Sequence, residues 1–303
     1  MFYKRPKMID YLDIKEIMRA LFILLLFVLN TAFSQTLIVS HKGIWKDHLV
    51  PQNSMSSLKK ALDNGFKGIE FDVFKTKDNE FVLAHDDDIS KVTTCSGKIS
   101  NMTLAEARKC LIIKNTTLPI TQLLLKNVKN PEPIVSLIDI VNALFFDDRV
   151  NFIWIDMKDQ SLDVIPVLRK LSNQISDNKV LNKIVINNLS VELLKRLKIE
   201  LPQFKYSLEG KWGSEPLTDY KKYIDGIGIT HDYISLNVGI YMGHEPLYKL
   251  ICRRKRFWRY LNSFFQLAKS KAIPVIGWTV NSRKKIQKLK NMEIDFLLTD
   301  RIK

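Results

Sequence analysis

The sequence predicts a closed (β/α)8 barrel of the TIM type, with a β-hairpin and a small insertion after the second strand. Short β-rich runs recur along the 303 residues with helical stretches between them, which is typical of a parallel sheet. A hydrophobic content of 46% is ample for one large core. A doubly wound open sheet is the alternative, but no glycine-rich nucleotide loop follows the first strand.

Eight runs carry the strand prediction, because β-branched and other apolar residues dominate them. They are 36–40, 68–73, 152–157, 183–187, 204–208, 226–230, 274–279 and 295–299. In a barrel of this kind the side chains that do chemistry lie at the C-terminal ends of the strands.

Helix signals fill most of the intervals between the strands. Ser54 is a candidate N-cap and Gly65 a stop signal, and the residues between them share an apolar face: Leu58, Ala61 and Leu62. Residues 190–198 and 282–291 have the same character. These intervals supply the crossovers that parallel strands need.

A hairpin is predicted where residues 80–85 return against the second strand. The intervening "TKDN" at 76–79 is too short for a parallel crossover. If Asp78 and Asn79 form a two-residue turn, position 72 faces position 85.

Residues 1–34 are interpreted as a signal peptide. Five basic residues precede an almost wholly apolar run at 20–33, which is shorter than the roughly 20 residues that a membrane-spanning helix needs. Small residues follow where a signal peptidase cleaves. We expect an exported protein, periplasmic or extracellular, whose catalytic barrel occupies residues 35–303. An uncleaved N-terminal membrane anchor is the alternative.

The chain is strongly basic, with a formal net charge of +15. The first 34 residues hold five basic and three acidic side chains, so +13 remains without them. This charge favours anionic partners such as phosphate esters or lipid head groups. An anionic membrane surface is a secondary candidate partner, and no nucleic acid is expected because no recognised motif for it is present.

The densest basic cluster, at 252–260, is interpreted as the solvated face of an amphipathic helix. Apolar residues recur around it at helical spacing: Leu247, Ile251, Trp258, Leu261, Phe265 and Ala268. Cys95, Cys110 and Cys252 are too few for a disulfide framework or a structural zinc site. Cys95 and Cys110 could pair in an oxidising compartment.

Carboxylates interrupt two of the apolar strands. Glu70 and Asp72 alternate with apolar residues in "IEFDV", so both point to one face, where they repel each other and lose hydration. A hard divalent cation, Ca²⁺ or Mg²⁺, would offset both effects; a solvated pair at a strand end is the alternative. In "FIWIDMKD", Asp156 could complete the ligand set and Lys158 neutralise a phosphate, or the two could form a rim salt bridge.

Two histidines lie at strand ends. His41 ends the first strand and His85 the return strand of the hairpin. Two imidazoles at one barrel mouth can act as general base and general acid, because imidazole titrates near neutrality. His231, at the end of the run 226–230, is a further candidate.

In this order the residues resemble the glycerophosphodiester phosphodiesterase family, a branch of the phosphatidylinositol-phospholipase-C-like phosphodiesterase superfamily. "SHKG" at 40–43 is similar to the family's opening His-Arg-Gly, and "PQNS" at 51–54 to Pro-Glu-Asn-Thr. "GFKGIEFDVFKTKDNEFVLAHDD" resembles the ligand strand, hairpin and His-Asp motif, and "IDMK" resembles Glu-x-Lys. "IGWTVN" and "FLLTDR" look like the closing strands, so the resemblance runs from about 37 to 301.

The resemblance implies a metal-dependent enzyme that hydrolyses small-molecule glycerophosphodiesters to an alcohol and glycerol 3-phosphate. It further implies that the glycerol 2-hydroxyl, and no protein side chain, attacks phosphorus. The implied site residues fall into three groups: His41 and His85 as acid–base pair; Glu70, Asp72 and Asp156 as ligands of one divalent cation, Ca²⁺ or Mg²⁺; and Lys42, Lys158 and Trp278 as substrate-binding residues.

Three positions depart from the family pattern. Lys42 replaces arginine and lacks its bidentate fork. Gln52 replaces glutamate, which removes a negative charge, and Asp156 replaces glutamate with a shorter side chain. Two other functions therefore stay open: a phospholipase-like hydrolase of lyso- or intact phospholipids, and a catalytically silent barrel that binds phospholipid or glycerophosphate. The presence of both His41 and His85 argues against the silent barrel.

Overall fold

The computed structural model describes residues 16–19, 21, 36–117, 124–175, 177–210, 232–237 and 255–301. The chain divides into two units, Met1–Gln35 and Thr36–Lys303. None of the helices within the described ranges is long and apolar enough to cross a membrane. The apolar run at 20–33 lies outside those ranges except for Leu21, so the signal peptide stays a prediction.

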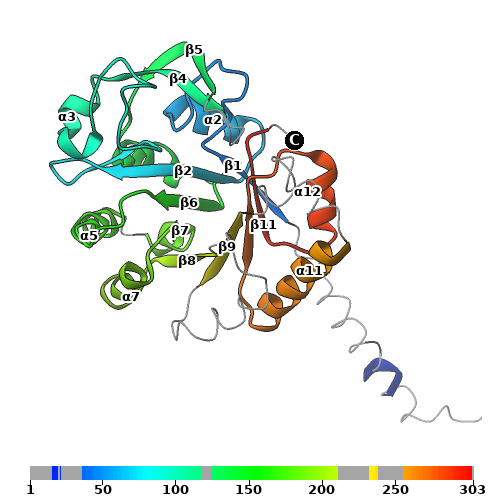
Figure 1. Cartoon of the computed structure of the whole chain (residues 1–303). Helices are drawn as coiled ribbons and strands as arrows, with labels where there is room; N and C mark the ends of the chain where they lie inside the picture. The colour runs from blue at the N-terminus through cyan, green and yellow to red at the C-terminus, as the bar shows by residue number, and fades with distance from the viewer. Residues whose placement is uncertain are drawn as a thin grey trace, which may run out of the picture. The chain divides into compact units, whose positions relative to one another are not determined.

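Eight parallel strands close into a barrel in the second unit, as the sequence predicts (Figure 1). The strands are β1 (Leu37–His41), β2 (Gly68–Lys75), β6 (Phe152–Met157), β7 (Ile184–Asn187), β8 (Lys205–Gly210), β9 (Tyr233–Asn237), β10 (Val275–Trp278) and β11 (Phe296–Thr299). Closure comes from β1, which pairs in parallel with both β2 and β11. A closed sheet leaves no edge among these strands.

Helices cover the outside of the strands, where α5, α7, α11 and α12 are visible in Figure 1. The helices in chain order are α2 (Met55–Asp63), α4 (Leu137–Ile140) continued by a π-turn (Val141–Phe145), α5 (Val164–Gln174), α6 (Asn178–Leu181), α7 (Val191–Glu200), α11 (Lys255–Ser270) and α12 (Arg283–Lys290). Ser54 caps α2 as predicted, through a capping box with Ser57. The helices predicted at 190–198 and 282–291 are confirmed as α7 and α12.

The barrel interior is a stack of side chains from alternate strand positions. Phe152 stacks on Phe296 with ring centroids 4.4 Å apart, and the buried interior cluster is completed by these residues: Val39, Trp154, Val185, Ile276 and Leu298. Because side chains alternate along a strand, the residues two positions further along β1, β6, β7, β10 and β11 face the barrel mouth. This stack forms the floor below the mouth.

The sixth barrel strand differs from the prediction. The run 226–230 lies outside the described residues, and β9 comprises Tyr233–Asn237, paired with β8 and β10. Both runs are short and β-rich, so local composition does not separate them. On α11, Leu261, Phe265 and Ala268 are buried as expected, whereas Leu247, Ile251 and the side chains of 252–257 lie outside the described residues.

The predicted register of the hairpin is wrong by one residue. Strand β3 (Phe81–Leu83) pairs antiparallel with β2, and Val73 lies opposite Leu83. The loop holds three residues between Thr76 and Glu80, and Asn79 adopts a positive φ of 60°. Asparagine tolerates this left-handed conformation, which is typical of a three-residue hairpin loop. Position 72 therefore faces position 84 and not 85.

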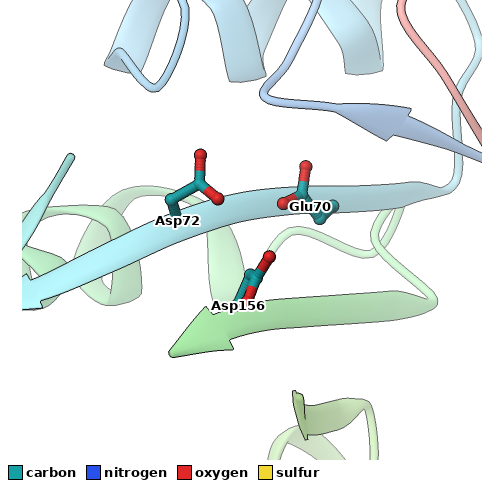
Figure 2. A group of neighbouring side chains, drawn as sticks. All are labelled: Glu70, Asp72 and Asp156. Atoms are coloured by element: carbon teal, nitrogen blue, oxygen red, sulfur yellow. The ribbon is translucent and has the colours of Figure 1, made fainter. Parts of the chain in front are cut away.

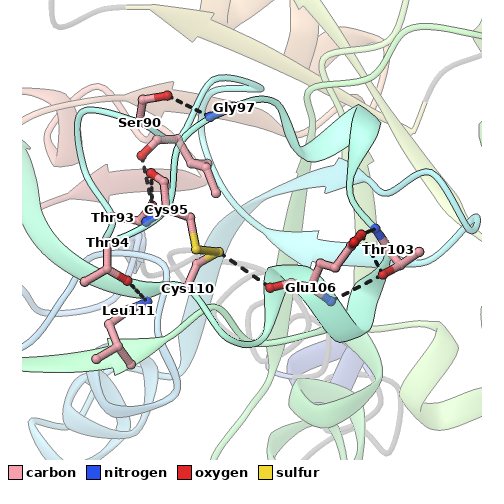
Figure 3. Close-up of a disulfide and its surroundings, with 10 residues drawn as sticks. Ser90, Thr93, Thr94, Cys95, Gly97, Thr103, Glu106, Cys110 and Leu111 are labelled. Carbon is pink, nitrogen blue, oxygen red and sulfur yellow. Dashed lines mark hydrogen bonds between the residues drawn. A yellow bond between two sulfur atoms is a disulfide. The ribbon is translucent and has the colours of Figure 1, made fainter.

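The insertion after the hairpin forms a small lobe with its own apolar cluster. It contains a 3₁₀ turn (Ile99–Asn101), α3 (Leu104–Ala107) and the antiparallel pair β4 (Leu111–Thr117) and β5 (Leu124–Pro133). Its buried cluster includes Ile89, Ile112 and Ile134. Cys95 and Cys110 form a disulfide with their Cα atoms 5.3 Å apart (Figure 3). The pairing considered from the sequence is thus present, and it ties the segment around Cys95 to the residue directly before β4.

Gly43→Ala is expected to destabilise the barrel more than Gly65→Ala. Both glycines have positive φ, 76° and 79°, so alanine strains the backbone at each by roughly 1–2 kcal/mol. A Cβ atom at Gly43 would also collide with the backbone and side chain of Ser57, whereas nothing lies within 4 Å at Gly65. We expect Gly43→Ala to lower the free energy of unfolding in urea by about 1–3 kcal/mol more than Gly65→Ala. Equal losses would contradict this packing argument.

Candidate active site

All eight site residues predicted from the sequence line one cavity at the C-terminal ends of the barrel strands. The cavity has a volume of ≈ 190 Å³. The predicted residues on its wall are His41, Lys42, Glu70, Asp72, His85, Asp156, Lys158 and Trp278. Most of them lie on the interior face of a strand or directly after it, so the period-two pattern brings them to the mouth.

The three carboxylates come from two adjacent strands. Asp72 of β2 lies directly beside Asp156 of β6 in the parallel register, and Glu70 precedes Asp72 by one strand repeat. Figure 2 shows the three side chains on the same side of the two strands. One oxygen from each carboxylate lies within 4.8 Å of the others. Glu70 and Asp72 are each only 1% exposed.

Two lysines partly neutralise this cluster. Lys42 Nζ lies 3.1 Å from Asp72 Oδ2. Lys158 Nζ lies 2.9 Å from Asp72 Oδ1 and 2.9 Å from Asp156 Oδ2. Three carboxyl groups thus face two ammonium groups in a poorly hydrated space, where charge imbalance is costly.

Burial divides the charge unequally among the carboxylates. Burial and the neighbouring Asp72 hold the pKa of Glu70 well above its ordinary value, against the Lys42 ammonium. Burial acts in the same direction on Asp72, but Lys42 and Lys158 outweigh it and the pKa of Asp72 lies well below its ordinary value. Asp72 therefore loses its proton at a lower pH than Glu70. A further positive charge at the cluster would favour ionisation of Glu70 as well.

The donor set fits a hard divalent cation. Asp72 Oδ1 and Asp156 Oδ1 are buried without a hydrogen bond, although the first lies against the Lys158 ammonium. Carboxylate oxygens are the ligands that Ca²⁺ and Mg²⁺ prefer. Glu70, Asp72 and Asp156 could therefore hold such an ion, and Asp156 Oδ1 is an oxygen that no hydrogen bond of the protein occupies.

Asn53 supports the cluster and was not predicted from the sequence. Its Nδ2 donates to Asp72 Oδ2 at 2.7 Å, and its Oδ1 accepts from the Asp72 backbone N–H at 3.1 Å. Asn53 has a positive φ of 54° and is buried. It follows Gln52 within "PQNS", so the motif at 51–54 was the available signal.

His41 is held by an aspartate that the sequence reasoning missed. His41 Nδ1 lies 2.6 Å from Asp300 Oδ1. Asp300 Oδ2 also accepts from Lys46 Nζ at 2.8 Å and from Asn281 Nδ2 at 2.6 Å. Burial would raise the pKa of Asp300, but His41 and Lys46 outweigh it and lower that pKa. The carboxylate thus fixes the ring orientation of His41.

His85 reaches the cavity although the predicted hairpin register is wrong. Strand β3 ends at Leu83, and the backbone bends at His85, so strict alternation no longer applies there. His85 Nδ1 lies 2.8 Å from Asp86 Oδ1, and the side chain is 43% exposed. The structure therefore places one histidine deep in the barrel mouth and one at its hairpin side.

Trp278 presents an unused donor to the cavity. Its indole Nε1 is buried and has no hydrogen-bond partner in the described part of the chain. A buried indole N–H usually finds an acceptor, so this side chain can donate to a bound oxygen.

The further candidate from the sequence, His231, lies outside the described residues.

Comparison with known proteins shows the same fold and family. Residues 41–303 match the Glycerophosphoryl diester phosphodiesterase family. The chain is 37% identical over 75 residues to a glycerophosphodiester phosphodiesterase of Caldanaerobacter subterraneus, covering 25% of this chain and 30% of that protein. It is 21% identical over 248 residues to human glycerophosphodiester phosphodiesterase 1, covering 80% of this chain and 71% of that protein.

Solved structures of similar fold cover most of this chain. A putative glycerophosphoryl diester phosphodiesterase from Silicibacter pomeroyi has a TM-score of 0.64 at 15% identity, covering 89% of this chain and 95% of that chain. A phosphodiesterase from Oleispira antarctica, in complex with the product sn-glycerol-3-phosphate, has a TM-score of 0.61 at 16% identity, covering 88% and 94%. At these identities the likeness concerns the fold. The match over 41–303 spans most of the barrel, and the chain therefore belongs to the glycerophosphoryl diester phosphodiesterase family.

Proposed function

We propose that this protein is a metal-dependent hydrolase that cleaves small-molecule glycerophosphodiesters into an alcohol and glycerol 3-phosphate. The observation that carries the proposal is the single cavity in which three clustered carboxylates, two lysines and two histidines meet. Family membership supports it, as do relatives named glycerophosphodiester phosphodiesterase. The glycerol 3-phosphate in the Oleispira structure is a product of this type.

The charges of the cavity suit a phosphodiester. When bound, a divalent cation such as Ca²⁺ or Mg²⁺ supplies positive charge that stabilises the phosphoryl oxygens. Lys42 and Lys158 add fixed positive charge at the same place, and Trp278 Nε1 can donate to a substrate oxygen. These groups orient the phosphate and leave the two histidines for proton transfer.

The attacking group is the glycerol 2-hydroxyl. Neither serine nor cysteine lines the cavity among the described residues, and a hydroxyl tethered to the phosphate gains an intramolecular advantage. His41, oriented by Asp300, takes the proton of that hydroxyl as its oxygen bonds to phosphorus. The bond to the alcohol oxygen breaks, and His85 donates a proton to it. Water then opens the resulting cyclic phosphate to give glycerol 3-phosphate.

We also propose that the protein is exported, with residues 1–34 as the signal peptide and the barrel acting outside the cytoplasm. The disulfide between Cys95 and Cys110 supports this proposal, because such bonds persist in oxidising compartments. We further propose that the protein contacts an anionic membrane surface, through its basic residues or through an uncleaved N-terminal segment. The net charge of +15 supports this contact.

Chelation should abolish hydrolysis, and Ca²⁺ or Mg²⁺ should restore it, because the carboxylate cluster requires another positive charge. Asp72→Asn should lower kcat/KM for glycerophosphocholine by more than about 100-fold and weaken cation binding measured by calorimetry. Asp148→Asn, an exposed aspartate between α4 and β6, is the matched control and should change neither. Full activity of the Asp72 variant after chelation would disprove the metal assignment.

His41→Ala and His85→Ala should each lower kcat by roughly 10²-fold or more, because each removes a proton-transfer group. The wild-type rate should follow a bell-shaped pH profile. Asp300→Asn should lower kcat less than His41→Ala and shift one limb of the profile, because the amide cannot stabilise the imidazolium. Asp63→Asn, an exposed helix residue, is the control. Wild-type turnover in either histidine variant would end the two-histidine mechanism.

A glycerophosphocholine analogue with hydrogen in place of the glycerol 2-hydroxyl should bind but release choline at least about 10³-fold more slowly, because the tethered nucleophile is lost. Choline release from the analogue and its parent provides the comparison. Acylation of the 2-hydroxyl should block cleavage too, which would exclude intact diacyl phospholipids. If the 2-deoxy analogue turned over at the parental rate, water would be the direct nucleophile.

A further inference from the structure

A second cavity lies on the hairpin side of His85. Its volume is ≈ 40 Å³, and His85 lines both this cavity and the larger one. The wall is formed by the loop before α2, the end of β3 and the insertion, and it includes Gln52, Ile89, Ile112 and Ile134. Asn53, which donates to Asp72 in the larger cavity, also lines the smaller one, so the two cavities lie side by side with His85 between them.

Gln52 presents an unpaired acceptor on this wall. Its side chain is held in place, because Nε2 donates to Thr116 Oγ1 at 2.7 Å and its backbone N–H donates to Asn115 Oδ1 at 2.7 Å. The residue is only 7% exposed, yet its Oε1 is buried without a hydrogen-bond partner in the described part of the chain. A buried acceptor in a fixed position selects for a ligand that donates to it.

The proton transfer proposed for His85 determines which part of the substrate faces this cavity. His85 donates its proton to the departing alcohol oxygen, so the alcohol must lie against the imidazole. The metal-binding carboxylates, Lys42 and Trp278 all line the larger cavity and none of them lines the smaller one. The glycerophosphate half therefore occupies the first cavity and the alcohol half points into the second.

Size and polarity restrict the alcohol. A volume of ≈ 40 Å³ holds about three water-sized groups, such as two carbons and one terminal atom. The cavity is partly open, so a larger alcohol would remain partly in solvent. Most of the wall is apolar. The terminal atom of the alcohol can donate a hydrogen bond to the buried acceptor Gln52 Oε1. Asp86 and Lys114 also line the cavity with opposite charges, so hydrogen bonding and not net charge makes the selection.

We propose that this second cavity binds the leaving alcohol and favours a two-carbon alcohol that ends in a hydrogen-bond donor, the chemistry of ethanolamine. Choline is disfavoured twice, because its three methyl groups cannot all be covered by a cavity of this volume and its nitrogen carries no hydrogen to donate. This inference rests on the proposed function and adds a substrate class to it.

The test is a set of four glycerophosphodiesters assayed with the full chain. They differ only in the alcohol group, called the head here. Three heads are of nearly equal size, namely 2-aminoethyl, 2-hydroxyethyl and propyl, and the fourth is choline. We expect kcat/KM for the aminoethyl and hydroxyethyl heads to exceed that for propyl and choline by about tenfold or more. Equal values for aminoethyl and propyl would overturn the role of Gln52, and equal values for aminoethyl and choline would overturn the size limit.

Two variants test whether this cavity causes the preference among the four diesters. Gln52→Leu should remove the preference for aminoethyl over propyl, while Gln287→Leu, an exposed glutamine of α12, should keep it. Ile112→Ala, which widens the wall, should raise kcat/KM for choline relative to aminoethyl, and it serves as the second probe if Gln52→Leu fails to fold. An unchanged preference in both cavity variants would contradict the assignment.

Binding separates this inference from the proposed function. Calorimetry with non-hydrolysable phosphonate analogues of the aminoethyl and choline diesters measures the subsite without turnover. Hydrolysis of all four diesters with equal kcat/KM would refute the subsite and leave the proposed function intact. Tighter binding of the aminoethyl phosphonate by a chain that hydrolyses none of the diesters would support the subsite and refute the proposed activity.

Discussion

The site depends on one electrostatic constraint, the close approach of three carboxylates at the mouth of a barrel. One oxygen from each lies within 4.8 Å of the others, and Glu70 and Asp72 are almost fully buried. Like charges at such distances repel strongly where water is scarce. Lys42 and Lys158 reduce this repulsion in the protein alone, and burial together with the neighbouring Asp72 raises the pKa of Glu70. The same constraint explains why the cluster suits a divalent cation and an anionic substrate beside it.

The loop after β1 is shaped to meet this constraint. Lys42, Gly43 and Asn53 all have positive φ values, and such conformations persist where surrounding contacts hold them. The Lys42 backbone N–H donates to Glu70 Oε2 at 2.7 Å, and Ser57 Oγ donates to the Lys42 carbonyl at 3.1 Å. The N-terminal turn of α2 is thus connected directly to the carboxylate cluster, so helix capping and site geometry are parts of one hydrogen-bond network.

The two histidines are supported in different ways. His41 is the last residue of β1, and Asp300 directly follows the adjacent strand β11. Barrel closure therefore brings His41 Nδ1 to 2.6 Å from Asp300 Oδ1. His85 comes from the hairpin outside the barrel, with Asp86 as its partner. The insertion that follows forms much of the second cavity beside it. The barrel strands and the residues directly after them therefore supply the carboxylates, the lysines and His41, while the hairpin and insertion form the wall on the side of His85.

Alternation along single strands determined much of this protein from sequence alone. Glu70 and Asp72 share a face, and Asp156 lies on the interior side of its strand, because side chains repeat every two residues. Trp278 was identified only through the resemblance to a family. The hairpin register was not determined in this way, because the loop holds three residues and not two, with Asn79 in the left-handed conformation. Composition also could not separate 226–230 from Tyr233–Asn237, whose place as β9 is decided by pairing with β8 and β10. The pair of His41 and Asp300 joins residues 259 positions apart, and only closure of the barrel between β1 and β11 creates that contact.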